Sequence, residues 1–250
     1  MRKIVSLILI SIFVLIYSCS EDKANFPSDY QFEQKDWTEY FPLKKGAYWI
    51  YAGWHGSDYD EKDSPDFYDT MIVEKKINIK GHVAYFLKRN GGWENDTYFY
   101  FDGPYLYELR PKKYEDAYGS IWMMVADFIL KQESKPKVFN WKENQGDANS
   151  NNYSKLLITN TLQKDSDSTK NIMDSIYTVT RFTNTLLIDF TQKSGTDNLD
   201  GYKHEQIINS YYIKNIGLAF SIKKYTYTDL KGQKVIIYRY LKLIKYYIPE

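Results

Sequence analysis

Short runs of β-branched and aromatic residues, separated by tight-turn signals, constrain the fold of this chain more than any other feature. Three pairs of such runs flank turn residues: Met71–Ile79 with His82–Lys88, Thr97–Phe101 with Tyr105–Leu109, and Leu218–Thr228 with Lys234–Tyr247. Asp102-Gly103 lies between the second pair, and Asp-Gly is among the stronger short-range hairpin signals. Runs joined by short turns predict antiparallel meanders rather than βαβ units.

The rest of the chain fits the same pattern. Further β-rich runs are Tyr153–Leu162, Ile176–Phe182 and Leu186–Thr191. Ser120–Lys131 has apolar residues near helical spacing, but a buried strand fits it almost as well. The polar stretches Asp147–Asn152 and Lys164–Asn171 are expected to be loops. We predict a mainly β, single domain over residues 37–250, with antiparallel meanders forming a curved sheet, partial barrel or sandwich and at most one or two short helices.

The single cysteine directs attention to the N-terminus. Arg2 and Lys3 precede an apolar run, Ile4–Tyr17, which as a helix would span about 21 Å. This is short of the hydrocarbon core of about 30 Å, and the run is therefore typical of an export signal. One cysteine permits no internal disulfide and no thiolate cluster.

Ile16-Tyr17-Ser18-Cys19 resembles the bacterial lipobox, in which a small residue directly precedes a lipidated cysteine. The resemblance implies that residues 1–18 are a lipoprotein signal peptide. Cys19 would then become the acylated (palmitate-type) N-terminus and hold the protein to a lipid bilayer, since two or more acyl chains anchor stably. An uncleaved membrane anchor with an incidental cysteine is the alternative.

Residues 19–36 are expected to be the lipidated cysteine and a flexible tether, since they are polar and nearly free of aliphatic residues. Ser20, Glu21 and Asp22 resemble the export signal of surface-displayed lipoproteins of Bacteroidota. A chain rich in Lys, Asn, Ile and Tyr fits the same phylum. The resemblance implies lipoprotein export machinery as a partner, the outer membrane as location and the cell surface as its side, with the periplasmic face as the alternative.

The charge balance argues against nucleic acid as a partner. Cleavage of the signal removes Arg2 and Lys3 from the 33 basic residues and none of the 32 acidic ones, so basic and acidic residues nearly balance in the mature chain. Nucleic-acid binders usually carry a concentrated basic face.

Two segments resemble a family of uncharacterised Bacteroidota outer-membrane lipoproteins. Tyr40–Tyr51 (YFPLKKGAYWIY) is similar to its FPLxxGxxWxY opening, and Tyr212–Leu218 (YIKNIGL) to its YxKxIGL segment near the C-terminus. The resemblance implies a β-rich fold and no catalytic residue. Physically the first segment indicates packing, with Trp49 and Tyr51 on one face of a strand and Tyr48 and Ile50 on the other.

No enzyme, cofactor or metal motif was found in the sequence. It has no GxSxG, HExxH, P-loop or GxGxxG pattern. His55, His82 and His204 lack ligand spacing; we expect His82 to be a solvated loop residue. The acidic stretch Asp58–Asp69 lacks the glycine and distal glutamate of a calcium loop. We therefore assign no catalytic residue, no metal and no cofactor.

Aromatic residues and hydroxyl motifs supply the remaining candidate sites. Most aromatic residues should fill the core, but Trp54 and Trp93 adjoin glycine and expected loops and could stack on a ligand. Asp69-Thr70-Met71, Asp167-Ser168-Thr169 and Asp174-Ser175-Ile176 resemble the motif that Bacteroidota O-glycosylate. Thr70, Ser168 and Ser175 are thus candidate acceptors, with unmodified hydroxyls as the alternative.

These observations favour a non-enzymatic binding or accessory role for a membrane-anchored exported lipoprotein, with a glycan or an envelope protein as ligand. A lipid-anchored glycan-processing hydrolase and a structural partner in an envelope complex are the alternatives. A cleft with two carboxylates about 5–10 Å apart would favour the hydrolase. An exposed coplanar aromatic pair without such acids would favour a glycan binder, and a large apolar patch would favour a protein partner. The ligand and the oligomeric state stay open.

Overall fold

Strands dominate the computed structural model, which describes residues 37–57, 64–91, 95–111, 120–131, 134–145, 152–194, 200–228 and 233–250. The strands are β1 (Tyr48–Gly56), β2 (Phe67–Ile79), β3 (His82–Asn90), β4 (Thr97–Asp102), β5 (Tyr105–Pro111), β6 (Ser120–Asp127), β7 (Lys137–Gln145), β8 (Asn152–Lys164), β9 (Ser168–Ile172), β10 (Ser175–Ser194), β11 (Asp200–Ile213), β12 (Gly217–Thr228) and β13 (Lys234–Tyr247). A 3₁₀ turn, η1 (Trp37–Tyr40), precedes them. No helix of the described residues is long and apolar enough to cross a membrane.

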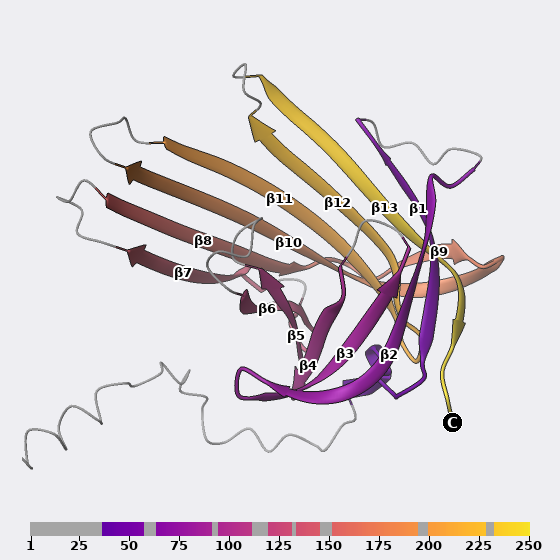
Figure 1. Ribbon diagram of the computed structural model, residues 1–250. Helices are drawn as coiled ribbons and strands as arrows, with labels where there is room; N and C mark the ends of the chain where they lie inside the picture. Colours follow the sequence, from indigo (N-terminus) through magenta and orange to yellow (C-terminus); the bar gives the residue numbers. More distant parts are fainter. Residues whose placement is uncertain are drawn as a thin grey trace, which may run out of the picture. The chain divides into compact units, whose positions relative to one another are not determined.

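The strands form one open antiparallel sheet. Its order is β6-β5-β4-β3-β2-β1-β13-β12-β11-β10-β8-β7, and β9 pairs with β10 off this path. The sheet thus consists of two meanders that meet where β1 pairs with β13 (Figure 1). The edge strands β6 and β7 do not pair with each other, so the sheet is not closed. The predicted mainly β fold of antiparallel meanders is confirmed.

The chemistry of the turns explains the hairpins. Lys80 and Gly81 both have positive φ, 49° and 80°, as a two-residue hairpin of type I′ requires. Strands β2 and β3 pair directly on either side of them. His82 begins β3, where its ring stacks on Tyr100 at 4.1 Å, so the expectation of a solvated loop residue is wrong.

For two segments, the structure either chooses between the predicted helix and strand or differs from the predicted loop. Ser120–Asp127 is the strand β6, which selects the strand over the helix. The stretch 164–171 is only partly a loop, because β9 occupies its second half and pairs with the start of β10. Its polar residues suit a hairpin whose side chains largely face solvent. Residues 147–151 lie outside the described part of the chain.

The segments Tyr40–Tyr51 and Tyr212–Leu218 pack directly against each other. The Trp49 indole N–H donates to the carbonyl of Ile216 at 2.6 Å, and the Tyr51 hydroxyl donates to that of Leu218 at 2.9 Å. Gly217 has φ 104°, and a Cβ there would lie 2.5 Å from the Phe41 ring. Both sequence segments therefore build one core contact, in which Trp49 and Tyr51 are fully buried as expected for one face of β1.

The two faces of the C-terminal meander are covered differently. We call the face that carries Asn160 and Asn184 the β6 face, because their side-chain amides donate to the β6 carbonyls of Met124 and Val125 at 3.2 and 2.9 Å. The opposite face carries Tyr211, with Lys170 of β9 over its ring, and we call it the β9 face. β9 also lies against β13.

Candidate functional site

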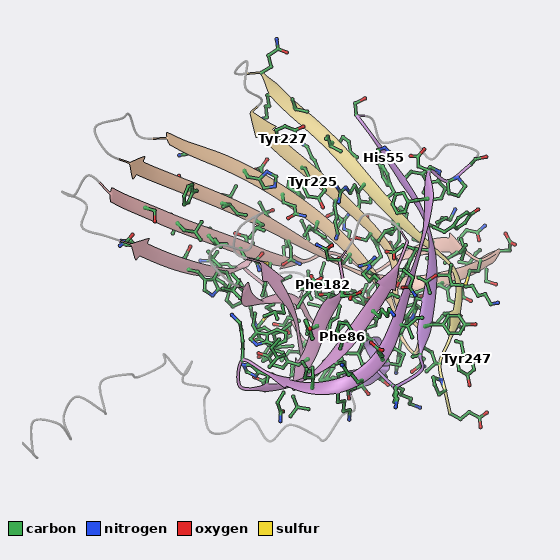
Figure 2. All side chains as sticks on the ribbon, in the orientation of Figure 1. His55, Phe86, Phe182, Tyr225, Tyr227 and Tyr247 are labelled. Atoms are coloured by element: carbon green, nitrogen blue, oxygen red, sulfur yellow. The ribbon has the colours of Figure 1, made fainter. Side chains whose placement is uncertain are left out.

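A groove of about 410 Å³ crosses β8, β10, β11, β12 and β13. Its lining is Leu157, Thr159, Leu187, Ile188, Asp189, Lys203, His204, Glu205, Thr226, Tyr227 and Lys234. This volume lies within the range of about 300–1,000 Å³ that is usual for small-molecule sites. Figure 2 shows Tyr227 and Tyr225 on β12, in this part of the sheet.

Strand register places most of these side chains on the β9 face in two parallel rows. Residues that pair directly across antiparallel strands point to the same face. One row holds Leu157, Asp189 and Lys203. The neighbouring row runs from Thr159 through Leu187, Glu205 and Thr226. Because side chains alternate between the two faces along each strand, residues far apart in the sequence lie together on one surface of the sheet.

One side of the groove is apolar. Leu187 exposes 45% of its surface although it lies in the middle of the long strand β10, and the half-buried Leu157 lines the groove from β8. Residues 186–188 are three consecutive apolar residues, so a strand must turn one of them away from the buried face. Leu186 takes the buried position and Leu187 the open one.

The charged residues of the groove balance each other. Lys203 and Asp189 form an ion pair at 3.2 Å, with side chains 83% and 41% exposed. An ion pair this open contributes little to stability, because solvent screens it. Glu205 and Lys234 add one further charge of each sign. Asp189 and Glu205 are diagonal neighbours in register, so their Cα atoms are roughly 7–8 Å apart.

Thr226 supplies a buried polar atom to the groove. The residue is only 8% exposed, and its hydroxyl oxygen has no hydrogen-bond partner among the described residues. A hydroxyl can donate one hydrogen bond and accept two. Buried polar atoms are nearly always satisfied, so an unsatisfied one requires an explanation such as a water or a ligand.

The opposite face under the groove carries a histidine with shifted ionisation. Burial lowers the pKa of His204, so its imidazole is neutral at neutral pH and adds no charge to the balance. Its ring lies 6.0 Å from that of Tyr225, which also has the Arg239 guanidinium 5.1 Å from its centre.

The sequence-predicted stacking residues do not build this groove. Trp54 is 5% exposed and its indole N–H donates to the carbonyl of Ser64 at 3.1 Å, so it offers no face to a ligand. The reason is that Trp54 pairs in register with Tyr240, another buried ring. Trp93 lies outside the described residues, as do Cys19, Ser20, Glu21 and Asp22.

The candidate glycosylation sites divide by exposure. Ser168 and Ser175 are exposed and lie on the β9–β10 hairpin, whereas Thr70 is half-buried in the interior strand β2. Among the histidines, His55 lies 3.2 Å from the carboxylate of Asp66. Residues 58–63 of the acidic stretch are outside the described part of the chain. Among the described residues, no group of three His, Cys, Asp or Glu could hold a metal ion.

Sequence reasoning missed the groove itself. Its members come from five strands, and none belongs to a recognisable motif. The one local signal was the apolar run at residues 186–188, which predicts an outward-facing leucine. The unsatisfied hydroxyl of Thr226 depends on the packing of neighbouring strands, which sequence does not reveal.

No family model and no curated protein matches the chain. Two solved structures are similar over most of its length. One is a protein provisionally described as a lipoprotein from Parabacteroides distasonis, 10% identical, with a TM-score of 0.44, covering 83% of this chain and 98% of that one. The other is provisionally described as an exported protein with a YmcC-like fold from Bacteroides fragilis, 12% identical, with a TM-score of 0.36, covering 82% of this chain and 96% of that one. Likeness at this level defines neither a family nor a function for the chain.

Proposed function

We propose that this protein is an exported lipoprotein, held at the outer membrane by acylated Cys19, whose β domain binds a ligand in the groove on the β9 face. The lipobox and the short apolar run before it support the anchor. The groove supports the binding role. It combines an exposed leucine, balanced charges and a buried hydroxyl, which is how small-molecule sites combine apolar surface with a few placed polar groups.

The buried hydroxyl of Thr226 is the observation that carries the binding role. An unsatisfied polar atom costs about 1–3 kcal/mol when it is left buried. The hydroxyl oxygen itself has almost no solvent-accessible surface, so a ligand in the groove reaches it only when neighbouring side chains move, and a hydrogen bond made there recovers part of that cost. An ordinary solvated sheet face would leave such a hydroxyl in contact with water.

Hydrogen exchange tests the groove without knowledge of the ligand. The full chain is incubated with total envelope extract of the host, and amide protection is mapped. We expect protection of the groove strands β10 to β12, which Leu187→Asp should abolish by placing a charge on the apolar side. Val83→Asp is the matched control, since Val83 is 63% exposed on β3, outside the groove. Unchanged exchange of the groove strands in the extract would refute the binding role.

A glycan-processing hydrolase is the second candidate function, because Asp189 and Glu205 provide two carboxylates in one groove. The carboxyl groups of inverting glycosidases lie about 6.5–9.5 Å apart, and two side chains that start from Cα atoms roughly 7–8 Å apart can reach that spacing. The binding role is better supported, since Asp189 is engaged by Lys203 in an open, solvated ion pair. Release of reducing sugar from a bound glycan by wild type, and its loss in Glu205→Gln, would establish the hydrolase instead.

We further propose that the protein is displayed on the cell surface, as the acidic pair after Cys19 suggests. Acids beside the acyl chains lie at the headgroup surface, where export machinery can read them. Protease added to intact cells should digest the wild type, whereas a Glu21→Ala, Asp22→Ala double variant should remain anchored and become protected. Wild type that resists protease until the cells are lysed would place the protein on the periplasmic face.

A further inference from the structure

From the chemistry of the groove we infer its ligand class: a neutral oligosaccharide, held by its sugar rings on Leu157 and Leu187 and by its hydroxyls on Thr226 and Glu205. This inference rests on the proposed binding function and names the class of ligand. It follows from four properties of the described residues.

The first property is charge. The groove carries two lysines, Lys203 and Lys234, and two carboxylates, Asp189 and Glu205. Any anionic ligand that reaches the lysines also approaches the carboxylates. A cationic ligand that reaches the carboxylates likewise approaches the lysines. Electrostatic complementarity favours partners whose potential matches that of the site. A balanced site therefore favours an uncharged ligand.

The second property is the division of the lining into apolar and polar sides. Leu187 and Leu157 give a hydrocarbon surface, and Glu205 and Thr226 continue the row of Leu187 across the next two strands. A pyranose ring has the matching division, with C–H groups on its faces and hydroxyls around its rim. A hydrocarbon chain does not match, because four charged side chains line the groove.

The third property is hydrogen-bonding capacity. The Thr226 hydroxyl can donate and accept, and the Glu205 carboxylate beside it can only accept. A sugar hydroxyl both donates and accepts, so it can donate to Glu205 while it satisfies Thr226. A ligand with acceptors alone could not use Glu205.

The fourth property is position in the sheet. The groove lies over β8 and β10 to β13, each of which is paired on both sides. An extended peptide therefore cannot be added here as a further strand, because strand addition needs a free sheet edge. A ligand must bind through side chains, as a sugar does.

The test measures binding of defined oligosaccharides to the full chain in a detergent without sugar headgroups. The neutral probes are hexasaccharides of glucose, xylose, mannose and N-acetylglucosamine, and the anionic probe is hexagalacturonate. We expect at least one neutral probe to bind by calorimetry, with an affinity that barely changes between about 0.05 and about 0.5 M salt, since no net charge is paired.

Two variants tie this binding to the groove. Thr226→Val should weaken it about tenfold, the effect of losing one well-placed hydrogen bond to a buried group, while thermal stability stays equal or rises because an unsatisfied buried hydroxyl is removed. Leu187→Asp should abolish binding, and Val83→Asp should leave it unchanged. A Thr226→Val variant with unchanged affinity would overturn the assignment of that hydroxyl.

The outcomes separate the ligand class from the binding function. Binding of hexagalacturonate alone, lost at high salt, overturns the neutral class. If no probe binds but the protein fraction of the envelope extract still protects the groove, the class is wrong and the binding function stands. If neither probes nor extract affect the groove, both inferences fail.

Discussion

Single residues in this protein combine structural and candidate functional roles that their sequence neighbours do not reveal. Asp69 and Arg89 form an ion pair in the interior, with side chains 0% and 7% exposed. Asp69 pairs in register with Tyr51, whose hydroxyl also lies in the core. Burial raises the pKa of Tyr51 well above its usual value, with the neighbouring Arg89 opposing the shift. The ion pair thus lies in the interior beside the buried Tyr51.

Breaking the Asp69–Arg89 pair should be strongly destabilising. Arg89→Leu leaves a buried carboxylate without its cation, a change that typically costs about 3–5 kcal/mol. The double variant Asp69→Leu, Arg89→Leu should recover most of this loss, because it leaves no uncompensated charge. Urea unfolding measures both, and a single variant as stable as wild type would contradict the prediction.

Exposure also orders the three candidate glycosylation sites. We expect hexose-sized mass on Ser168 or Ser175, on the exposed β9–β10 hairpin, and none on Thr70, which is half-buried between paired strands. Intact-mass measurement of protein from its native host, with Ser168→Ala and Ser175→Ala variants, checks this. An unmodified wild-type mass would rule out O-glycosylation.

Among the elements, β6 is notable because side chains rather than a strand hold its second edge. Strand β5 pairs with one edge of β6, and a bulge opposite Leu106 and Tyr107 leaves Val125 unpaired there. Bulges disrupt the alternation of the ladder. Asn160 and Asn184 satisfy the carbonyls of Met124 and Val125. The side chains of Asn160 on β8 and Asn184 on β10 thus hydrogen-bond β6 to the opposite part of the same sheet.

Replacing Asn184 should loosen β6. Asn184→Leu leaves the buried carbonyl of Val125 without its donor, at a cost of about 1–3 kcal/mol. Hydrogen exchange in β6 should accelerate more than in β11 or β12. Asn171→Leu, at an exposed position of β9, serves as control and should change neither quantity. Unaltered β6 exchange in Asn184→Leu would refute the fastening role.

The stacked tyrosines of β4 and β5 should make the fold sensitive to alkali. Burial, with the Asp102 charge as a smaller cause, raises the pKa of Tyr107 to about 12, and burial raises that of Tyr100 as well. A raised folded-state pKa contributes stability that is present below the unfolded value of about 10 and is lost as pH rises through the folded value. Stability should therefore fall between about pH 10 and 12. Tyr107→Phe should reduce this fall in urea unfolding, and an equal fall in the variant would contradict the assignment.

At the scale of the whole molecule, two meanders become one sheet because β1 and β13 pair. These strands are the first and last of the described sheet, so the contact that joins the halves has the largest sequence separation. The packing of Phe41, just before β1, against Gly217 of β12 is a second contact between the N-terminal and C-terminal parts of the chain. The domain therefore depends on its C-terminal strand as much as on either meander.

The anchor is tested on the whole chain. Metabolic labelling with a palmitate analogue should tag wild type through Cys19, and Cys19→Ala should remain unlabelled and leave the membrane fraction. At least two acyl chains are needed for stable anchoring, so loss of the cysteine should release the protein. Equal labelling of both forms would refute the lipoprotein assignment.

The sequence by itself determined most of the strands and the tight turns, because these depend on local physics, whereas β7, β9 and β11 were not predicted as strands. Alternation along β1 predicts that Trp49 and Tyr51 share one face of the strand. Lys80 and Gly81 both adopt the positive φ that their hairpin requires, and in the next predicted hairpin Gly103 does so while Asp102 is the last paired residue of β4. Where a second local reading fits almost as well, as at Ser120–Lys131, the sequence leaves both open, and the structure selects a strand whose residues 121 and 123–126 are buried.

Only the tertiary structure decided what is not local. The pairing of β1 with β13, the fastening of β6 by Asn160 and Asn184, and the burial of Trp54 all join segments far apart in the chain. The groove is the clearest case, since Leu187, Glu205 and Thr226 become neighbours only through the register of β10, β11 and β12. Register depends on the sum of many cross-strand contacts, and a shift of one residue would turn each of these side chains to the other face.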